Sequence, residues 1–299
     1  MPTEKEIEKF QGSEAQRREH FRAGRGNWEA FSFSMGSVWA AAKEWAEAIE
    51  GIEKPWLCWN VDPDWCLVQQ RLAIAMGWIP IVGTDPRAKA PSLEEHSVFV
   101  DFNRHLQLPT MSMLFPLEFV FLFTERIAFW HSDLLVREKK LKRIAEKFEN
   151  LENGQTTAVD ARPGWLGRLQ GKKGRFWELI GCTTREASRH QFEVGAGWWR
   201  HIENHPNCPN TKKEKVSRLK YPYDHGSGIL YWKRHHGGEV LPIRQDCVEE
   251  GHCTSIGRPE YIRVSPRDER RDLTKELSEN YSLRGICQRL NIDYYHAKP

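Results

Sequence analysis

The residues best suited to chemistry are His131, Ser132 and Asp133, which directly follow the apolar run Arg126–Trp130. In open α/β sheets, ligands bind beyond the carboxyl ends of the strands, so polar residues placed there face a crevice. An imidazole and a carboxylate two residues apart can share a divalent cation that holds a diphosphate. The alternative interpretation is that His131 packs in the core and Asp133 caps the helix that follows.

A second group of acids and a histidine lies late in the chain, at Glu249, Glu250 and His252. An imidazole together with a carboxylate holds Mn²⁺ better than Mg²⁺, which prefers oxygen ligands. A zinc site that uses Cys247, His252 and Cys253 is an alternative, although no second ligand pair has suitable spacing.

Two further segments combine small residues with reactive or aromatic ones. Gly197, Trp198 and Trp199 belong to the predicted helix 195–203, and their ring faces suit the apolar face of a sugar or a base. Packing of this helix on a sheet is the alternative. Asp224 precedes a Gly-Ser-Gly turn and can serve acid–base chemistry, although an ordinary turn explains it as well.

The elements that must position these residues follow from the pattern after residue 54. Short apolar runs alternate there with helical stretches, which predicts a sheet built largely from β-α-β units. We expect strands at 55–60, 78–82, 97–102, 126–130, 155–159, 175–182, 228–233 and 240–243. We expect helices at 37–50, 64–76, 110–124, 136–151 and 195–203, and a mobile Gly-, Lys- and Arg-rich loop at 162–175. Asp62 should cap the helix at 64–76 and Gly77 should end it. The helix at 136–151 is amphipathic and should turn Leu141, Ile144, Ala145 and Phe148 inward.

The strand that ends in His131-Ser132-Asp133, after two β-α units whose strands also end in polar residues, resembles the GT-A nucleotide-sugar glycosyltransferases. The resemblance covers about residues 54–256 and departs from the family's usual Asp-x-Asp, because His131 replaces the first acid. It implies an α/β, GT-A-like (Rossmann-like) fold with a mixed, mostly parallel central sheet flanked by helices. It also implies transfer of a sugar from a nucleotide diphosphate sugar to an acceptor hydroxyl.

Residue roles follow from the same resemblance. His131, Asp133 and the late His252 would bind Mn²⁺ or Mg²⁺ as the cofactor, so we expect His252 and Asp133 to approach closely enough to reach one cation. Contacts with the nucleotide-sugar donor are implied for Asn60, Asp62, Asp85 and Ser132, and contacts with the acceptor for Gly197, Trp198 and Trp199. Turn or cap roles are the alternatives for the donor residues. If the reaction inverts, an acid must deprotonate the acceptor, for which the candidates are Glu249, Glu250 and Asp224.

Composition limits the remaining classes of protein. The net charge of +3 supplies no broad basic field of the kind that dominates non-specific nucleic-acid binding. The start of the chain lacks a signal-peptide pattern, and the apolar stretch 111–123 is too short and interrupted for a membrane span. The seven cysteines are not spaced as in a disulfide framework, which favours reduced thiols and a cytoplasmic location.

We expect three parts of the chain: a helical lead-in at 1–51 packed on the core, a GT-A-like catalytic domain at 52–262, and a small C-terminal helical appendage at 263–299. Residues 272–293 resemble the first part of a helix-turn-helix, but too few residues follow for a recognition helix. A non-catalytic nucleic-acid or protein-binding module that uses its 13 tryptophans is therefore the alternative function. A hybrid, a glycosyltransferase that acts on modified bases in DNA, is also open. The acceptor is thus a saccharide or a modified nucleic acid.

Overall fold

The computed structural model of the 299-residue chain describes a central α/β body. The residues described are 5, 35–85, 88–102, 104, 123–161, 165–169, 175–198, 226–252 and 283–293. Most of the helix expected at 110–124 lies outside these residues, as do Trp199, Asp224, Cys253 and the first half, 272–282, of the helix-turn-helix-like stretch 272–293.

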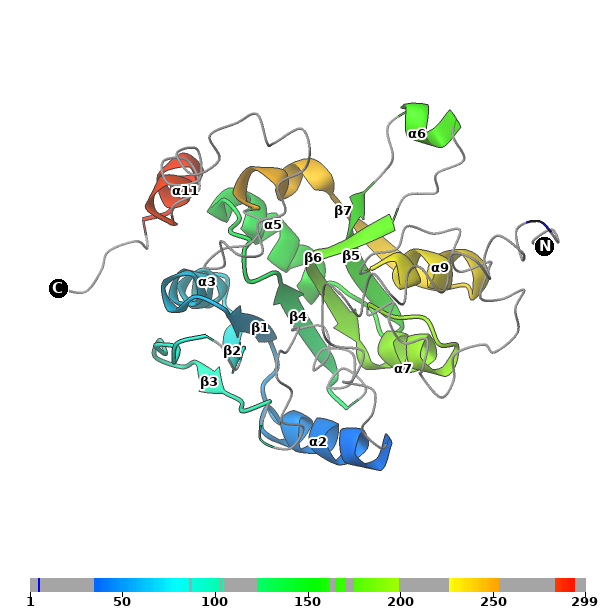
Figure 1. The fold of residues 1–299 in the computed structure, drawn as a ribbon, viewed down its shortest axis with the longest axis horizontal. Coiled ribbons are helices and arrows are strands. Elements are labelled where there is room, and N and C mark those ends of the chain that lie inside the picture. The colour runs from blue at the N-terminus through cyan, green and yellow to red at the C-terminus, as the bar shows by residue number, and fades with distance from the viewer. Residues whose placement is uncertain are drawn as a thin grey trace.

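A seven-stranded mixed sheet forms the centre of the described part (Figure 1). Its strand order is β3-β2-β1-β4-β6-β5-β7. Neighbours β1–β2, β2–β3, β1–β4 and β5–β7 are parallel, whereas β6 is antiparallel to both β4 and β5. Every strand except β6 therefore runs in one direction, and the expectation of a mixed, mostly parallel sheet is confirmed. The strands are β1 (Pro55–Asn60), β2 (Ile79–Thr84), β3 (Val98–Phe99), β4 (Arg126–Trp130), β5 (Gln155–Ala161), β6 (Arg175–Thr184) and β7 (Glu239–Arg244).

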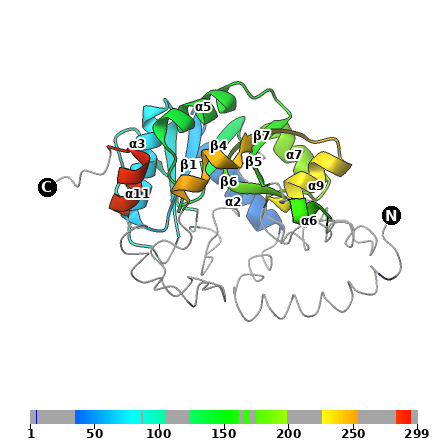
Figure 2. The same cartoon turned by 90° about the horizontal axis from the view of Figure 1, so that it is seen from above.

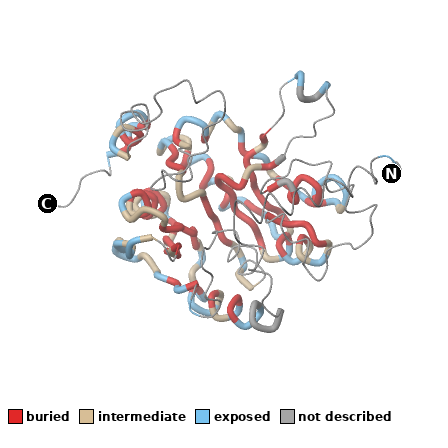
Figure 3. Tube along the Cα trace, in the orientation of Figure 1, coloured by how far each residue is buried: buried red, intermediate tan, exposed pale blue. Residues whose placement is uncertain are grey.

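Helices cover both faces of this sheet, which explains why the inner strands are apolar on both sides. All six residues of β1 are buried. Trp56 and Cys58 of β1 pack in a cluster with residues of α3 (Pro63–Ala75), α5 (Glu138–Glu149) and α11 (Leu283–Leu290). Leu57 and Trp59 pack on the other face with residues of α2 (Met35–Glu47), α7 (Arg185–Glu193) and α9 (Ser227–His235). The two helical layers are seen in Figure 2, and the buried sheet between them in Figure 3.

Two helices next to the site form for reasons that are visible in the sequence. Asp62 occupies the N-cap of α3, where its side chain accepts hydrogen bonds from the backbone amides of Asp64 and Trp65, as the sequence predicted. In α5 the predicted inward face is buried, and its members are Leu141, Ile144, Ala145 and Phe148.

Three predicted elements differ from the structure. The strand predicted at 228–233 is the helix α9, which begins after Gly226 at φ 77° and ends in three basic residues that favour a helix C-terminus. A short apolar run does not distinguish a buried helix from a buried strand, and here tertiary packing decides. Strand β3 has two residues instead of six. Residues 195–198 of the helix predicted at 195–203 are not helical.

The expected loop 162–175 contains the short helix α6 (Trp165–Leu169). The chain after β7 forms two 3-10 turns, η3 (Gln245–Cys247) and η4 (Glu249–Gly251). Among the helices of the described ranges, none is long and apolar enough to cross a membrane.

Candidate metal centre

The three residues of the candidate centre come from two segments that pair beside the sheet. His131 directly follows β4, and its backbone amide donates to the carbonyl of Leu179 in β6 at 2.8 Å. Leu134 forms an isolated antiparallel bridge with His252, and the amide of Leu135 donates to the carbonyl of Gly251 at 3.0 Å. This pairing places His252 next to the turn that contains His131 and Asp133.

A buried side chain of α3 fixes the shape of this turn. The Gln69 amide nitrogen donates to the carbonyl oxygens of His131 at 2.7 Å and Leu134 at 2.8 Å. Gln69 is fully buried, so these bonds form where water does not compete. The turn is therefore tied to α3, to β6 and to the segment around His252 at once.

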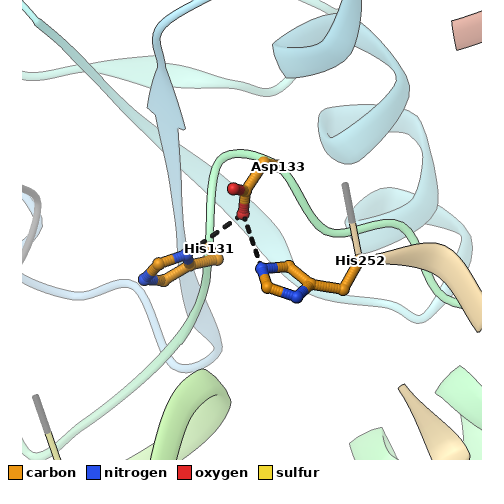
Figure 4. A group of neighbouring side chains, drawn as sticks. All are labelled: His131, Asp133 and His252. Carbon is orange, nitrogen blue, oxygen red and sulfur yellow. Dashed lines mark hydrogen bonds and ion pairs between the residues drawn. The ribbon is translucent and has the colours of Figure 1, made fainter. Parts of the chain in front are cut away.

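The side chains of the three residues converge on one carboxylate oxygen (Figure 4). His131 Nδ1 lies 3.1 Å and His252 Nε2 lies 3.5 Å from Asp133 Oδ1. One ligand atom from each of the three residues can be chosen so that all lie within 4.8 Å of one another. The predicted approach of His252 to Asp133 is confirmed.

These separations suit a transition-metal ion. Metal bonds of about 2.0 to 2.2 Å, at angles between octahedral and tetrahedral, place neighbouring ligand atoms about 2.8 to 3.6 Å apart. The contacts of Asp133 Oδ1 with His131 Nδ1 and His252 Nε2, at 3.1 and 3.5 Å, fall in that interval. The side chains of His131, Asp133 and His252 are 26%, 13% and 28% exposed, so an ion from solvent can reach them. The described chain thus contains a group of residues that can hold a metal ion.

The alternative role of Asp133 as a helix cap is not what the structure shows. Arg137 occupies the N-cap position of α5, and no side chain makes a capping hydrogen bond there. Asp133 instead faces two histidines. The alternative zinc site with Cys247, His252 and Cys253 stays untested, because Cys253 lies outside the described residues; the metal-capable group found among the described residues contains no cysteine.

A fourth residue of the site, Glu178 in β6, was missed at the sequence level. Its Oε1 lies 3.4 Å from His131 Nε2, and its side chain is 8% exposed. The signal that could have found it is a carboxylate inside the otherwise apolar run of β6, since an acid is rarely buried unless it is paired. His131 therefore stands between two carboxylates, Asp133 on Nδ1 and Glu178 on Nε2.

The electrostatics of the centre follow from this arrangement. Burial disfavours a charge on His131, but the carboxylates of Asp133 and Glu178 outweigh it and raise the pKa of His131 to about 10. Burial also opposes the charge on Asp133, yet His131 and His252 hold the pKa of Asp133 well below its usual range. Without a metal, a proton on His131 therefore supplies positive charge between the two carboxylates.

The predicted donor residues Asn60, Asp62 and Asp85 lie at the carboxyl ends of β1 and β2, on the same edge as the metal centre. Asn60 is fully buried, and its amide nitrogen donates to Thr84 Oγ1 and to the carbonyl of Lys89, both at 2.8 Å. Asp62 is the cap of α3, and Asp85 is buried. Ser132 is half-buried in the turn between the metal residues. Contact of these residues with a donor stays a prediction.

The acceptor prediction needs one correction, at Trp198. This side chain is 1% exposed and packs edge-on against Phe129, with ring centroids 4.8 Å apart, so its ring is not available as a platform. Gly228 of α9 allows a close approach to the backbone of Gly197, because a Cβ on Gly228 would lie 2.2 Å from the Gly197 carbonyl oxygen. The segment is therefore a packing junction between α7 and α9 as far as residue 198.

The acids of η4 are exposed and engaged away from the metal centre. Glu250 lies 3.2 Å from Lys140 Nζ and 3.5 Å from Arg137 Nη2, and its ion pair with Lys140 lowers its pKa. Glu249 contacts the side chain of Gln245. These partners anchor η4 to α5 and to the preceding turn η3. The backbone carbonyl of Glu250 also accepts from Arg289 of α11 at 2.9 Å, which ties the C-terminal helix to the same region.

The fold and the site together define an α/β domain with a candidate His-Asp-His metal centre at the carboxyl edge of a mixed sheet. Comparison with known proteins finds no family model, no curated protein and no solved structure that matches the chain. The function must therefore be argued from the site.

Proposed function

We propose that this chain is a metal-dependent glycosyltransferase of the GT-A type. The observation that carries the proposal is the convergence of His131, Asp133 and His252 at the end of β4. Ligands of open α/β sheets bind at this edge, and the mixed, mostly parallel sheet agrees with the one that the GT-A resemblance implies. A nucleotide diphosphate sugar would place its diphosphate at the centre.

Different residues of the chain would bind the cation, orient its ligands and support the turn at this centre. His131, Asp133 and His252 would hold the cation, Mn²⁺ in preference to Mg²⁺ because two of the three ligands are nitrogens. When bound, the cation neutralises charge on the leaving diphosphate. Glu178 would accept a hydrogen bond from the Nε2–H of His131, which leaves Nδ1 as the ligating atom beside Asp133. Gln69 holds the turn that contains His131 and Asp133 in place through its hydrogen bonds to the carbonyl oxygens of His131 and Leu134.

In the transfer step, the bond between the anomeric carbon and the diphosphate oxygen breaks, and a bond to the acceptor oxygen forms. If the reaction inverts, the acceptor hydroxyl gives its proton to a general base. The candidate acids are Asp224, Glu249 and Glu250. Glu250 is held in ion pairs with Arg137 and Lys140 on the side of α5, and Asp224 lies outside the described residues.

Calorimetric titration of the full chain with nucleoside diphosphates, with and without Mn²⁺, tests this proposal. We expect binding of one of them to require Mn²⁺, and we expect the nucleotide sugar of the same base to be consumed in the presence of a suitable acceptor. His252→Ala should raise the Mn²⁺ concentration needed for binding by about 10-fold or more. His235→Ala, which removes an exposed histidine of α9, is the matched control and should change nothing.

Two results would contradict the proposal. The first is absence of nucleoside diphosphate binding for uridine, guanosine, adenosine, cytidine and thymidine diphosphates at saturating Mn²⁺. The second is binding that is equally strong with a chelator present, because the diphosphate would then not depend on the metal centre.

A further inference from the structure

The short segment that ends in His252 contacts both the turn of the metal centre and the C-terminal helix α11. The amide of Leu135, in the chain that leaves the turn, donates to the carbonyl of Gly251 at 3.0 Å. Nη2 of Arg289, in α11, donates to the carbonyl oxygen of Glu250 at 2.9 Å. Figure 1 and Figure 2 both show α11 beside the turns that follow β7. The two carbonyls that precede His252 are therefore held by two different elements.

The packing around Gly251 leaves no room for a looser arrangement. Gly251 is buried. A Cβ there would lie 1.8 Å from the carbonyl oxygen of Leu135 and 2.8 Å from Cδ1 of Leu290 in α11, distances that real Cβ atoms do not show. The turn, the segment and the helix thus pack as one unit. Movement of α11 would change the position of Gly251 and of His252 next to it.

The helix α11 depends on this docking for its own structure. It has eight residues, and an isolated helix of that length is not stable in water. Its buried residues Ile286, Cys287 and Leu290 are at most 1% exposed. After the helix, Asn291 adopts φ 54° and the amide of Ile292 donates to the carbonyl of Cys287 at 2.8 Å, a C-terminal cap that returns Ile292 to the core. Folding and docking of α11 are therefore one equilibrium.

Charged side chains connect the exposed side of this junction. Nη2 of Arg137, at the N-cap of α5, donates to the carbonyl of Arg289 at 3.3 Å and lies 3.5 Å from Oε2 of Glu250. Nζ of Lys140 lies 3.2 Å from the same carboxylate. Exposed ion pairs contribute little to stability, and the hydrogen bond from Arg289 is also exposed. Loss of that one hydrogen bond should therefore leave the chain folded.

We propose that Arg289 is a positioning residue of the metal centre, which holds the backbone that places His252, and that docking of α11 and metal binding strengthen each other. Arg289 is not one of the three candidate ligands and acts through His252. Because the coupling of two binding equilibria is reciprocal, an ion bound by His252 also holds α11 in place. The inference rests on the metal centre of the proposed function, but not on the transfer of a sugar.

A double-mutant cycle separates this role from a general loss of packing. Calorimetry of the full chain gives the Mn²⁺ affinity of the wild type, Arg289→Gln, His252→Ala and the double variant. We expect Arg289→Gln to lower the affinity about 3- to 10-fold, less than the loss of a group that contacts a ligand directly. In the His252→Ala background the same change should have no effect. A merely structural role would lower the affinity by the same factor in both backgrounds.

Two further variants of α11 control this result. Arg289→Lys keeps a cationic donor near the carbonyl of Glu250 and should recover part of the lost affinity. Arg284→Gln removes an exposed arginine of the same helix and should bind Mn²⁺ as the wild-type chain does. The thermal midpoint of each variant shows that it is folded.

The thiol of Cys287 reports the docking of α11 independently of metal affinity. It is 1% exposed, so an alkylating reagent reaches it only when α11 leaves the core. We expect Arg289→Gln to speed the labelling of Cys287 in the metal-free protein, measured by peptide mass spectrometry. Labelling of Cys182, which is buried in β6, should not change. Mn²⁺ should slow the labelling of Cys287 about 3-fold or more in the wild type, but not in His252→Ala.

Two results would overturn the inference alone: equal losses of Mn²⁺ affinity in both backgrounds of the cycle, and labelling of Cys287 that neither Arg289→Gln nor Mn²⁺ changes. A wild-type chain that binds no Mn²⁺ would overturn both the inference and the metal centre. If Mn²⁺ binds and the cycle behaves as expected but no nucleoside diphosphate binds, the role of Arg289 stands and the glycosyltransferase proposal fails.

Discussion

Polar residues follow the parallel strands β1, β2 and β4 at one edge of the sheet. Those after β1 and β2 make different contacts from those after β4. At the ends of β1 and β2, Asn60 holds Thr84 and the backbone of Lys89, and Asp62 caps α3. At the end of β4, His131 and Asp133 face each other and His252. The first group bonds to the Thr84 hydroxyl, a backbone carbonyl and the amides of a helix start, whereas the second group turns its polar atoms toward one point.

This difference teaches how to separate structural from chemical polar residues on one edge of a sheet. Position after a strand is shared by both groups, so it does not discriminate between them. The discriminating feature is whether the side chains bond to neutral groups of the scaffold or converge with other ionisable side chains on one point. Four predictions test this comparison.

The largest expected effect is at Asp133, because both histidines meet its Oδ1. Asp133→Asn keeps the shape of the side chain and removes the charge that attracts a cation. We expect the affinity for Mn²⁺, measured by calorimetry, to fall more than about 100-fold, with a thermal midpoint that shows a folded protein. Asp64→Asn, an exposed carboxylate in the first turn of α3, is the matched control. A loss below about threefold at Asp133 would remove it from the metal centre.

The next effect is at Glu178, which contacts His131 but is not one of the three ligands. Glu178→Leu should lower Mn²⁺ affinity by about 10- to 100-fold, because His131 loses the group that orients its ring. Glu178→Gln keeps an acceptor for the Nε2 proton and should recover part of the loss. Thr183→Val, another buried position of β6, controls for damage to the strand. Equal affinities of the Leu and Gln variants would show that Glu178 does not orient His131.

The third prediction concerns pH. The raised pKa of His131, about 10, means that this side chain is protonated in the metal-free protein at neutral pH. Metal binding must displace that proton, so the apparent Mn²⁺ affinity should rise by about 10-fold per pH unit between pH 6 and 8. In the metal-free protein, the same shift stabilises the fold fully below about pH 6.5, and this contribution is lost as pH rises through about 10. A pH-independent affinity would contradict protonation of the metal-free ligand.

The smallest effect on metal binding is expected at Asp62, on the other side of the comparison. Asp62→Ala removes the N-cap of α3 and should lower the free energy of unfolding by about 0.5 to 2 kcal/mol. Mn²⁺ affinity should stay within about twofold of the wild-type value, because Asp62 serves the helix. Chemical denaturation and calorimetry on the same sample measure both quantities. A large loss of Mn²⁺ affinity without loss of stability would place Asp62 with the metal residues.

The sequence by itself determined much of the scaffold. The strands β1 and β4 and the buried face of α5 were predicted with their residues, because apolar periodicity, the cap at Asp62 and the glycine at 77 are local signals. The same signals failed at α9, where the run Ile229–Trp232 is apolar on all sides and has no period to read. They also misassigned Trp198, because a large aromatic residue suits a core and a ligand surface equally well.

Only the tertiary structure decided which polar residues form the site. The pairing of Leu134 with His252 joins segments that are far apart in the sequence, and no local pattern encodes it. Glu178 enters because β6 runs antiparallel to β4 and continues past its end, which brings a buried acid beside His131. Strand order and register depend on the packing of both helical layers against the sheet, so the contacts that define the metal centre arise from the whole domain.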